Sequence, residues 1–377
     1  MRITTDRNLA FRDQPTPLDI KGVTKEFPKR AAEQKAGPAR LELSHLVSTV
    51  GKPKVELSME PGAARGSYDL RLHVENHRIG QHVFPRPPEL QQVEFLGDRG
   101  GRIKEPLQST AQYPSHLALH TRPSALARGL QREAQIDAAQ FAVGESGNQA
   151  TTVFAPENRF VFNDTSYPWS ACGRVDTPGG FGSGVMVGPR HMLTVSHVIQ
   201  WLSGGGAGWV RFRPMVFDGS APFGEAWGTW VYYKSKVTGP TIDWFEGQYD
   251  YVCVVLNNNI GNLTGWMGAR GYTDAWDGGN YWSHIGYPGD LTGGNRPTFE
   301  GSISLDGSFW QFDSHEAMSH RGDVWPGQSG GPFFGWWSGD VGPRAVAVQS
   351  SQNSSENNAS GGQDLVDLII RARNDHP

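Results

Sequence analysis

The later part of the chain is divided into many short runs of strand-forming residues, and this pattern limits the fold more than any other feature. From Phe160 onward, runs rich in Val, Phe, Tyr and Trp alternate with Gly, Pro, Asn and Asp, as at residues 208–213 and 228–233. β-Branched and aromatic side chains favour extended strands, whereas the intervening residues favour turns. Many short strands at close spacing predict an all-β barrel or sandwich rather than alternating strands and helices.

The composition changes near residue 150. Residues 1–150 contain 21 Lys and Arg and 17 Asp and Glu, a net charge of +4, whereas residues 151–377 carry −8. All 13 tryptophans lie between Trp169 and Trp337. We therefore expect a leader or pro-segment, partly disordered, at residues 1–150 and the all-β domain at residues 151–377. A partner-binding domain at residues 1–150 is the alternative.

A few segments have a predicted structure of their own. Prolines interrupt the charged residues 1–40, which predicts a flexible leader. Apolar and polar residues alternate at residues 68–74, as in a strand of a small domain. Loose helical periodicity predicts a helix at residues 125–141, and clearer periodicity predicts a short C-terminal helix at residues 364–372.

Composition also bears on partners and compartment. The net charge of −4 gives no support for a nucleic-acid partner, and no apolar run approaches the ~20 residues of a membrane span. No signal peptide follows Met1, although four Asn-x-Ser/Thr triplets point toward secretion. We expect a secreted protein, with an intracellular one as the alternative. A bridge between Cys172 and Cys253 stays open, because two cysteines do not define a disulfide framework.

Residues 325–334, Trp-Pro-Gly-Gln-Ser-Gly-Gly-Pro-Phe-Phe, place Ser329 among glycines and suit a nucleophile. Glycine lets the backbone turn tightly and approach a substrate closely. The amides of Gly327 and Ser329 can then point at one spot, as an oxyanion hole requires. A serine is a weak nucleophile alone, so it needs a base and a group that orients the base.

Candidates for both groups lie upstream. His197 follows Leu-Thr-Val-Ser, and Asp250 directly precedes the apolar run at residues 251–256. The chain order His, Asp, Ser is one of the known orders of a catalytic triad. Asp243 and Glu246 are close to Asp250 in the sequence, and either could be the orienting acid instead.

Several segments together resemble those of chymotrypsin-fold serine proteases. Residues 182–197 resemble the segment that carries the base histidine, and residues 249–256 the segment that carries the aspartate. Gly-Tyr-Pro-Gly-Asp at residues 286–290 is similar to a signature of the glutamyl endopeptidase-like branch, and residues 157–169 resemble the entry to the mature domain of secreted members. The resemblance covers roughly residues 153–377.

The resemblance implies a fold, a reaction and a class of substrate. The expected fold is two six-stranded antiparallel β-barrels with the site between them. The implied activity is that of a serine endopeptidase with His197, Asp250 and Ser329 as catalytic residues, no cofactor, and a protein or peptide substrate. In such an enzyme we expect residues 1–150, as a leader or pro-segment, to shield the cleft or to assist folding. A catalytically silent binding or scaffolding protein is the alternative.

Departures from the family pattern concern cleavage preference. Glutamate-specific relatives place a carboxylate-binding histidine where this chain has Gln349, so we expect no strong preference for glutamate. Asp323 occupies the position at which trypsin-like enzymes bind Lys or Arg, although an acid there can equally be structural. Ser350 and Gln352 complete the predicted substrate-binding set with these two residues.

Two histidines invite a metal interpretation that the spacing does not support. His315 and His320 have no third ligand at a suitable distance along the chain. We therefore expect no metal site and read both as surface or pocket-wall residues.

Overall fold

The structure is a computed structural model that describes residues 14–33, 55–61, 68–74, 87, 90–95, 108–126, 153–239, 241–307, 315–352 and 355–377. The chain divides into two units, Met1–Ala39 with Pro88–Pro377, and Arg40–Pro87. The smaller unit contains an antiparallel pair of strands, β1 (Val55–Pro61) and β2 (Tyr68–Val74). The predicted strand at residues 68–74 is therefore present.

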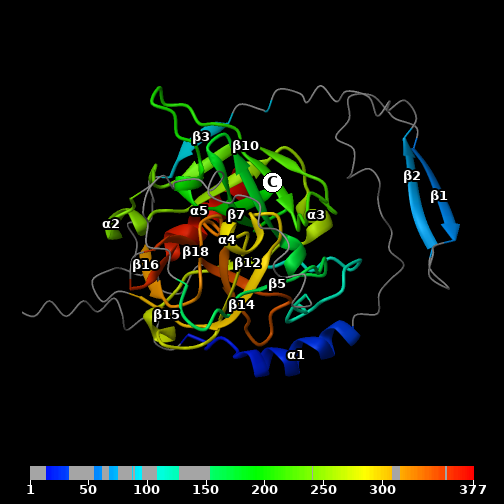
Figure 1. The fold of residues 1–377 in the computed structure, drawn as a ribbon, viewed down its shortest axis with the longest axis horizontal. Coiled ribbons are helices and arrows are strands. Elements are labelled where there is room, and N and C mark those ends of the chain that lie inside the picture. Colours follow the sequence, from blue (N-terminus) through cyan, green and yellow to red (C-terminus); the bar gives the residue numbers. More distant parts are fainter. Residues whose placement is uncertain are drawn as a thin grey trace, which may run out of the picture. The chain divides into compact units, whose positions relative to one another are not determined.

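Six strands of the larger unit close into a first antiparallel barrel (Figure 1). Their hydrogen-bonded order is β11–β8–β7–β6–β9–β10, and β10 pairs back onto β11. A closed sheet leaves no edge of unpaired backbone groups, which suits strands buried as completely as β8 and β11. The strands are β6 (Cys172–Thr177), β7 (Gly180–Met186), β8 (His191–Thr194), β9 (Arg211–Pro214), β10 (Ala226–Tyr233) and β11 (Val252–Leu256).

A second antiparallel barrel follows in the sequence, but it is open. Its strands run in the order β16–β19–β18–β17–β13–β14, and within the described residues no pairing joins β14 to β16. The main strands are β13 (Trp282–Gly286), β14 (Thr298–Ile303), β16 (Glu316–His320), β17 (Pro332–Gly335), β18 (Arg344–Gln352) and β19 (Asn357–Gly361). Short strands extend this sheet: β4 (Gln108–Ser109), β5 (Phe160–Val161), β12 (Gly268–Arg270) and β15 (Leu305–Asp306). The predicted all-β, two-barrel fold is confirmed.

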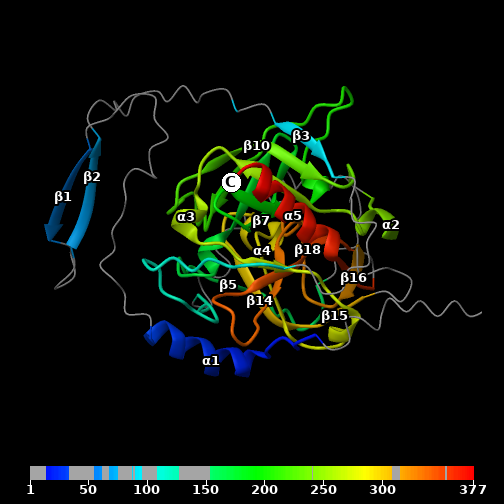
Figure 2. The ribbon, with the colours of Figure 1, turned by 180° about the vertical axis from the view of Figure 1, so that it is seen from behind.

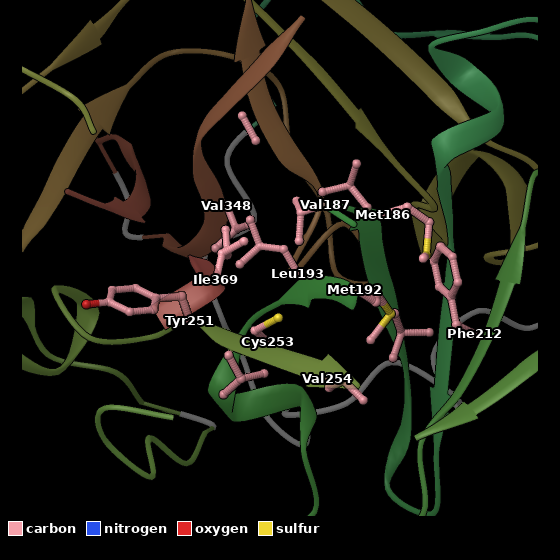
Figure 3. Close-up of a cluster of buried hydrophobic side chains, with 14 of the residues drawn as sticks. Met186, Val187, Met192, Leu193, Phe212, Tyr251, Cys253, Val254, Val348 and Ile369 are labelled. Carbon is pink, nitrogen blue, oxygen red and sulfur yellow. The ribbon is translucent and has the colours of Figure 1, made fainter. Parts of the chain in front are cut away.

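Helix α5 (Gln363–Asp375) closes the chain and covers the first barrel (Figure 2). Leu365, Leu368 and Ile369 are fully buried, as the periodicity predicts, so the C-terminal helix is confirmed. Figure 3 shows the core that it covers, where Ile369 of α5 and Val348 of β18 meet side chains of β8 and β11. Apart from α1, which is described below, the other described helices are short: α2 (Trp244–Gly247), α3 (Gly261–Thr264), α4 (Gly289–Thr292), η4 (Trp169–Ala171), η5 (Ser196–Val198) and η6 (Asp274–Trp276).

Both cysteines lie in this core as free thiols. Cys172 begins β6 and Cys253 lies in β11, and these two strands do not pair. Burial raises the pKa of each thiol above its ordinary value. The disulfide that the sequence left open is therefore not formed, and both groups remain protonated core side chains.

The flexible leader predicted for residues 1–40 is wrong for α1 (Ile20–Glu33). Val23 and Phe27 lie four residues apart on one helix face, and each is only 1% exposed. The Phe27 ring contacts the Trp336 ring edge-on at 4.5 Å, and the amide of Leu18 donates to the Trp336 carbonyl. The surrounding charges hide this short apolar face in the composition, which explains the wrong prediction.

Other parts of residues 1–150 also join the sheets. Strand β3 (Gln91–Glu94) pairs in parallel with β10, and β4 pairs with β12. Most of the helix predicted at residues 125–141 lies outside the described residues. Among the described residues, no helix has both the length and the apolar character needed to cross a membrane.

The contact between α1 and Trp336 yields a stability prediction. Phe27→Ala should loosen α1 from the barrel while the barrels stay folded, because truncating a buried Phe costs about 3 kcal/mol. We expect trypsin to cleave after Lys25 at least about tenfold faster. The thermal midpoint of the barrels should stay unchanged. Thr24→Ala, at an exposed position, is the control; equal cleavage of wild type and Phe27→Ala would contradict the packing role.

Candidate active site

Antiparallel pairing brings the candidate base and acid together. β8 pairs with β11 so that Thr194, at the end of β8, lies opposite Val252, at the start of β11. His197 follows β8 in the short helix η5, and Asp250 lies just before β11. The end of one strand and the start of its antiparallel neighbour share one edge of the sheet, so residues 53 positions apart meet there.

The carboxylate of Asp250 is fully buried and accepts three hydrogen bonds. The His197 amide donates to Oδ1 at 3.0 Å, and His197 Nδ1 lies 2.7 Å from Oδ2. The Ser350 hydroxyl, on β18 of the second barrel, donates to the same Oδ2 at 2.7 Å. With the carboxylate as acceptor, Nδ1 is the protonated ring nitrogen and Nε2 is left to accept a proton.

The two alternative acids have a different local role. Asp243 is the N-cap of α2, where its side chain accepts from the Glu246 amide at 2.8 Å. The Glu246 side chain in turn accepts from the Asp243 amide at 3.2 Å. This reciprocal capping box satisfies amides at the start of a helix. Asp250 is therefore the acid that the structure places on His197.

The segment that carries Ser329 packs against the end of β8. The Ser183 amide donates to the Ser329 carbonyl at 2.7 Å, and the Gly330 amide donates to the Gln349 carbonyl at 2.8 Å. A Cβ atom added to Gly330 would lie 2.2 Å from Thr194 Oγ1, and φ at Gly330 is +84°. Only glycine fits at this close approach.

The His197 and Ser329 segments both contact Gly182. A Cβ atom there would lie 2.7 Å from Val198 Cγ2 and 2.9 Å from the Ser329 carbonyl oxygen. Within the described residues, no hydrogen bond joins the Ser329 hydroxyl to His197. Bonds of this kind are often long in a free enzyme and shorten when substrate binds.

The turn before Ser329 leaves two amides available. The Gly327 carbonyl accepts from the Ser183 hydroxyl at 2.8 Å, and that hydroxyl accepts from the Tyr287 amide at 2.9 Å. Gly327 has φ of +97°. No described residue accepts a hydrogen bond from the Gly327 or Ser329 amide. The role of both amides in an oxyanion hole stays a prediction.

Gln349 is fixed by hydrogen bonds at both ends of its amide. The Gly322 amide donates to His320 Nδ1 at 3.2 Å, so Nε2 carries the proton and donates to Gln349 Oε1 at 2.9 Å. Gln349 Nε2 donates to the Ser351 carbonyl at 3.0 Å. Burial lowers the pKa of His320 to about 3, so this imidazole is neutral. The pair therefore supplies no positive charge for a substrate carboxylate.

Asp323 is fully buried, and its carboxylate already has partners. It accepts from the Phe154 amide at 2.6 Å and the Asn158 amide at 2.7 Å. These bonds hold residues 154–158 against the segment before Ser329. The structure therefore gives Asp323 the structural role that the sequence left open.

The other predicted residues lie at different places. The Ser350 hydroxyl points at Asp250, so it orients the acid rather than extending toward a substrate. Gln352 Nε2 is buried and has no hydrogen-bond partner among the described residues. The His315 ring stacks on the Tyr249 ring with their centroids 4.7 Å apart, and His320 is hydrogen-bonded to Gln349 as described above.

Sequence reasoning missed two residues that hold the site. Ser183 ties the Gly327 carbonyl to the Tyr287 amide, and Arg159 bonds to Gln328, the residue before Ser329. Both lie in segments with a family resemblance, at residues 182–197 and 157–169. Nothing in their spacing along the chain indicates these contacts.

Glu300 borders Asp323 and has an unusual protonation. Its Oε2 accepts from the Asp323 amide at 2.7 Å, and it lines a cavity together with His320 and Arg321. Burial, with the nearby charge of Asp323, raises the pKa of Glu300 to about 8. At neutral pH the folded protein keeps this carboxyl protonated, whereas the unfolded chain ionises it near pH 4.5.

This raised pKa makes stability depend on pH. Between pH 4.5 and 8 the folded state binds one more proton than the unfolded state. Stability should therefore fall as pH rises through this window, by up to about 1.4 kcal/mol per pH unit, and level off above it. Glu300→Gln should remove this contribution, which urea unfolding at pH 5.5, 7.0 and 8.5 will measure. Parallel pH profiles for wild type and variant would contradict it; exposed Glu94→Gln is the control.

Comparison with known proteins relates the chain to one group of enzymes. No protein-family model matches the sequence. The chain is 30% identical to glutamyl endopeptidase of Bacillus licheniformis over 197 residues, which is 51% of this chain and 58% of that relative.

Solved structures of proteases also match. One is a Glu endopeptidase in complex with MPD (22% identity, TM-score 0.49, 59% of this chain and 100% of that chain). Another is the protease Anisep from Arthrobacter nicotinovorans (20% identity, TM-score 0.42, 54% of this chain and 92% of that chain). The sequence match confirms the predicted resemblance: this two-barrel chain is related in sequence to glutamyl endopeptidase over about half of its length.

Proposed function

We propose that this chain is a serine endopeptidase that hydrolyses peptide bonds through His197, Asp250 and Ser329. The observation that carries the proposal is the buried Asp250 carboxylate, bonded to both His197 Nδ1 and the His197 amide. A buried charge is costly, and this one orients an imidazole whose other nitrogen is left to accept a proton. The relation to glutamyl endopeptidase supports the same chemistry.

The proposed reaction divides into acylation and deacylation. Ser329 Oγ attacks the carbonyl carbon of the substrate while His197 Nε2 takes the hydroxyl proton, and His197 then protonates the leaving amine. In deacylation, water attacks the acyl carbon while His197 Nε2 takes a proton from it, and His197 then returns this proton to Ser329 Oγ as the acid product leaves. Asp250 stabilises the imidazolium that forms in each half. The Gly327 and Ser329 amides bind the oxyanion, which is worth ~3 kcal/mol per donor where it has been measured. The reaction needs no cofactor.

Residues 1–150 belong to the proposal as a leader or pro-segment of a secreted protease whose catalytic domain is residues 151–377. Removal of this part would break the pairing of β3 with β10 and the contact of α1 with Trp336. Mass spectrometry of the protein from its natural source tests the proposal. A mature N-terminus near residue 150 supports processing, and an intact chain in the active enzyme contradicts it.

The triad generates a kinetic prediction. Ser329→Ala should lower turnover by several orders of magnitude, and His197→Ala should cost about as much, because triad members act as a unit. Asp250→Asn should keep the fold and cost ~10⁴ in kcat, because it favours the wrong tautomer of His197. Hydrolysis of a peptide library by purified full chains measures these effects.

Asp243→Asn is the matched control for Asp250→Asn. It alters only the cap of α2, so turnover should change little. A crippling effect of Asp243→Asn with a mild effect of Asp250→Asn would contradict the assignment of the acid. Full activity of Ser329→Ala, or a wild-type protein that binds peptides but is inactive both in full length and after processing near residue 150, would favour the silent binding protein instead.

The neutral pair of His320 and Gln349 generates a prediction about specificity. We expect no strong preference for Glu at the residue before the cut, because the neutral His320 and Gln349 offer no positive charge to bind a substrate carboxylate. We also expect no strong preference for Lys or Arg, because backbone amides occupy the Asp323 carboxylate. Cleavage-site sequencing of a peptide library measures both; overwhelming selectivity for either class would contradict the corresponding assignment.

A further inference from the structure

Arg159 is a buried cation that none of the proposed chemical steps uses. Its side chain is 0% exposed, and all five of its N–H donors are occupied. Two bond to Glu157, at 2.9 and 2.7 Å, and two bond to Asp290, at 3.3 and 2.6 Å. The fifth bonds to Gln328 Oε1 at 2.7 Å. Two carboxylates therefore more than balance the charge, and one donor remains directed at the neutral residue before Ser329.

The ion pairs keep Arg159 charged in this buried place. Burial alone would lower its pKa, but the hydrogen bonds and charges of Glu157 and Asp290 more than offset that effect and raise the pKa. The guanidinium is therefore a permanent, rigidly held donor. Its planar geometry suits two carboxylates and a fixed third acceptor at once.

Gln328 connects this bond to the turn at residues 325–328, which contains the predicted oxyanion donor Gly327. Its Oε1 also accepts from the Trp325 amide at 2.9 Å, and its own amide donates to the Trp325 carbonyl at 3.0 Å. The side chain and the backbone of Gln328 therefore close the same turn, which contains Gly327. Gln328 is 1% exposed and packs on Gly286, so it has no room for another position.

The chain segment that carries Arg159 is itself anchored beside this turn. The Phe154 and Asn158 amides donate to Asp323, which lies two residues before Trp325. The opposite side of the turn is held by the Gly289 amide, which donates to the Pro326 carbonyl at 2.8 Å. Arg159 thus reaches Gln328 from a segment that Asp323 fixes at Phe154 and at Asn158.

We propose that Arg159 is a positioning residue that holds Gly327 and Ser329 in oxyanion-binding geometry through Gln328. The proposal rests on the proposed serine-protease function. The bond to Gln328 positions the amides that stabilise negative charge in the transition state. Its loss should therefore reduce kcat more than it changes KM.

The test compares Arg159→Met and Gln328→Met in the full chain. Gln328→Met leaves Arg159 paired with Glu157 and Asp290, so it guards against a variant that fails to fold. Each variant should lower kcat per active site by between about tenfold and hundredfold. This loss is smaller than the roughly 10²–10³-fold loss in kcat on removing an oxyanion donor, because the donors are misplaced and not removed. KM should change less than about threefold, with active sites counted by the burst of acylation.

The double variant shows whether Arg159 acts through Gln328. If it does, the two losses will not add, and the double variant will resemble either single one. Arg344→Met is the matched control: Arg344 is 8% exposed and bonds to Asp340 and the Ser109 carbonyl in the second barrel. It should leave kcat per site unchanged. Unchanged kcat in Arg159→Met, or fully additive losses, would overturn the proposal.

Hydrogen exchange separates this proposal from the proposed function. The amides of Gln328, Gly330 and Gly331 are hydrogen-bonded in the structure, so their exchange reports the turn without any activity. Arg159→Met should exchange them at least about tenfold faster, whereas Arg344→Met should not. Equal exchange overturns the positioning role even if the enzyme is active. A wild-type protein that is inactive both in full length and after processing near residue 150 overturns the protease function and, with it, the catalytic part of this proposal.

Discussion

The buried carboxylate of Asp250 is the interaction on which the rest of the site depends. A charge without exposed surface is tolerated only where hydrogen-bond donors surround it, and here they come from both barrels. His197 supplies two donors from the end of β8, and Ser350 supplies one from β18. The carboxylate therefore fixes the imidazole and also ties the second barrel to the edge of the first. This bond gives the contact between the two barrels a defined geometry at the place where the proposed chemistry occurs.

The segment around Ser329 is held by groups that take no part in the chemistry. Ser183 fixes the Gly327 carbonyl, Asp323 anchors residues 154–158, and Arg159 bonds to Gln328. These groups are buried, so their bonds are strong and poorly screened by solvent. A turn held from several sides can keep two amides pointed at one spot before a substrate arrives, which is the condition for electrostatic stabilisation of an oxyanion.

The sequence predicts the parts of this molecule that depend on local pattern. Alternating strand and turn residues indicate an all-β barrel or sandwich, and glycines around Ser329 indicate a tight turn, because each follows from the conformational preferences of single residues. The division into two barrels is implied only by the resemblance to chymotrypsin-fold serine proteases. Helix α1 is missed because its apolar face consists of little more than Val23 and Phe27 among charges. The bond from Arg159 to Gln328 joins residues 169 positions apart, and no local pattern carries such a contact. Asp323 illustrates the same limit, since only the fold shows that amides 165 and 169 residues away already occupy it.

The most direct test of the account is the position of a covalent label. A fluorophosphonate reacts with a serine only where a base activates it and an oxyanion hole stabilises the adduct. The active form of the protein, whether full-length or processed near residue 150, should take up one equivalent, and peptide mapping by mass spectrometry should place it on Ser329. Heat-unfolded chain should take up none. No labelling of the folded protein, or a label on any other residue, would contradict the assignment of Ser329, His197 and Asp250 as one catalytic unit.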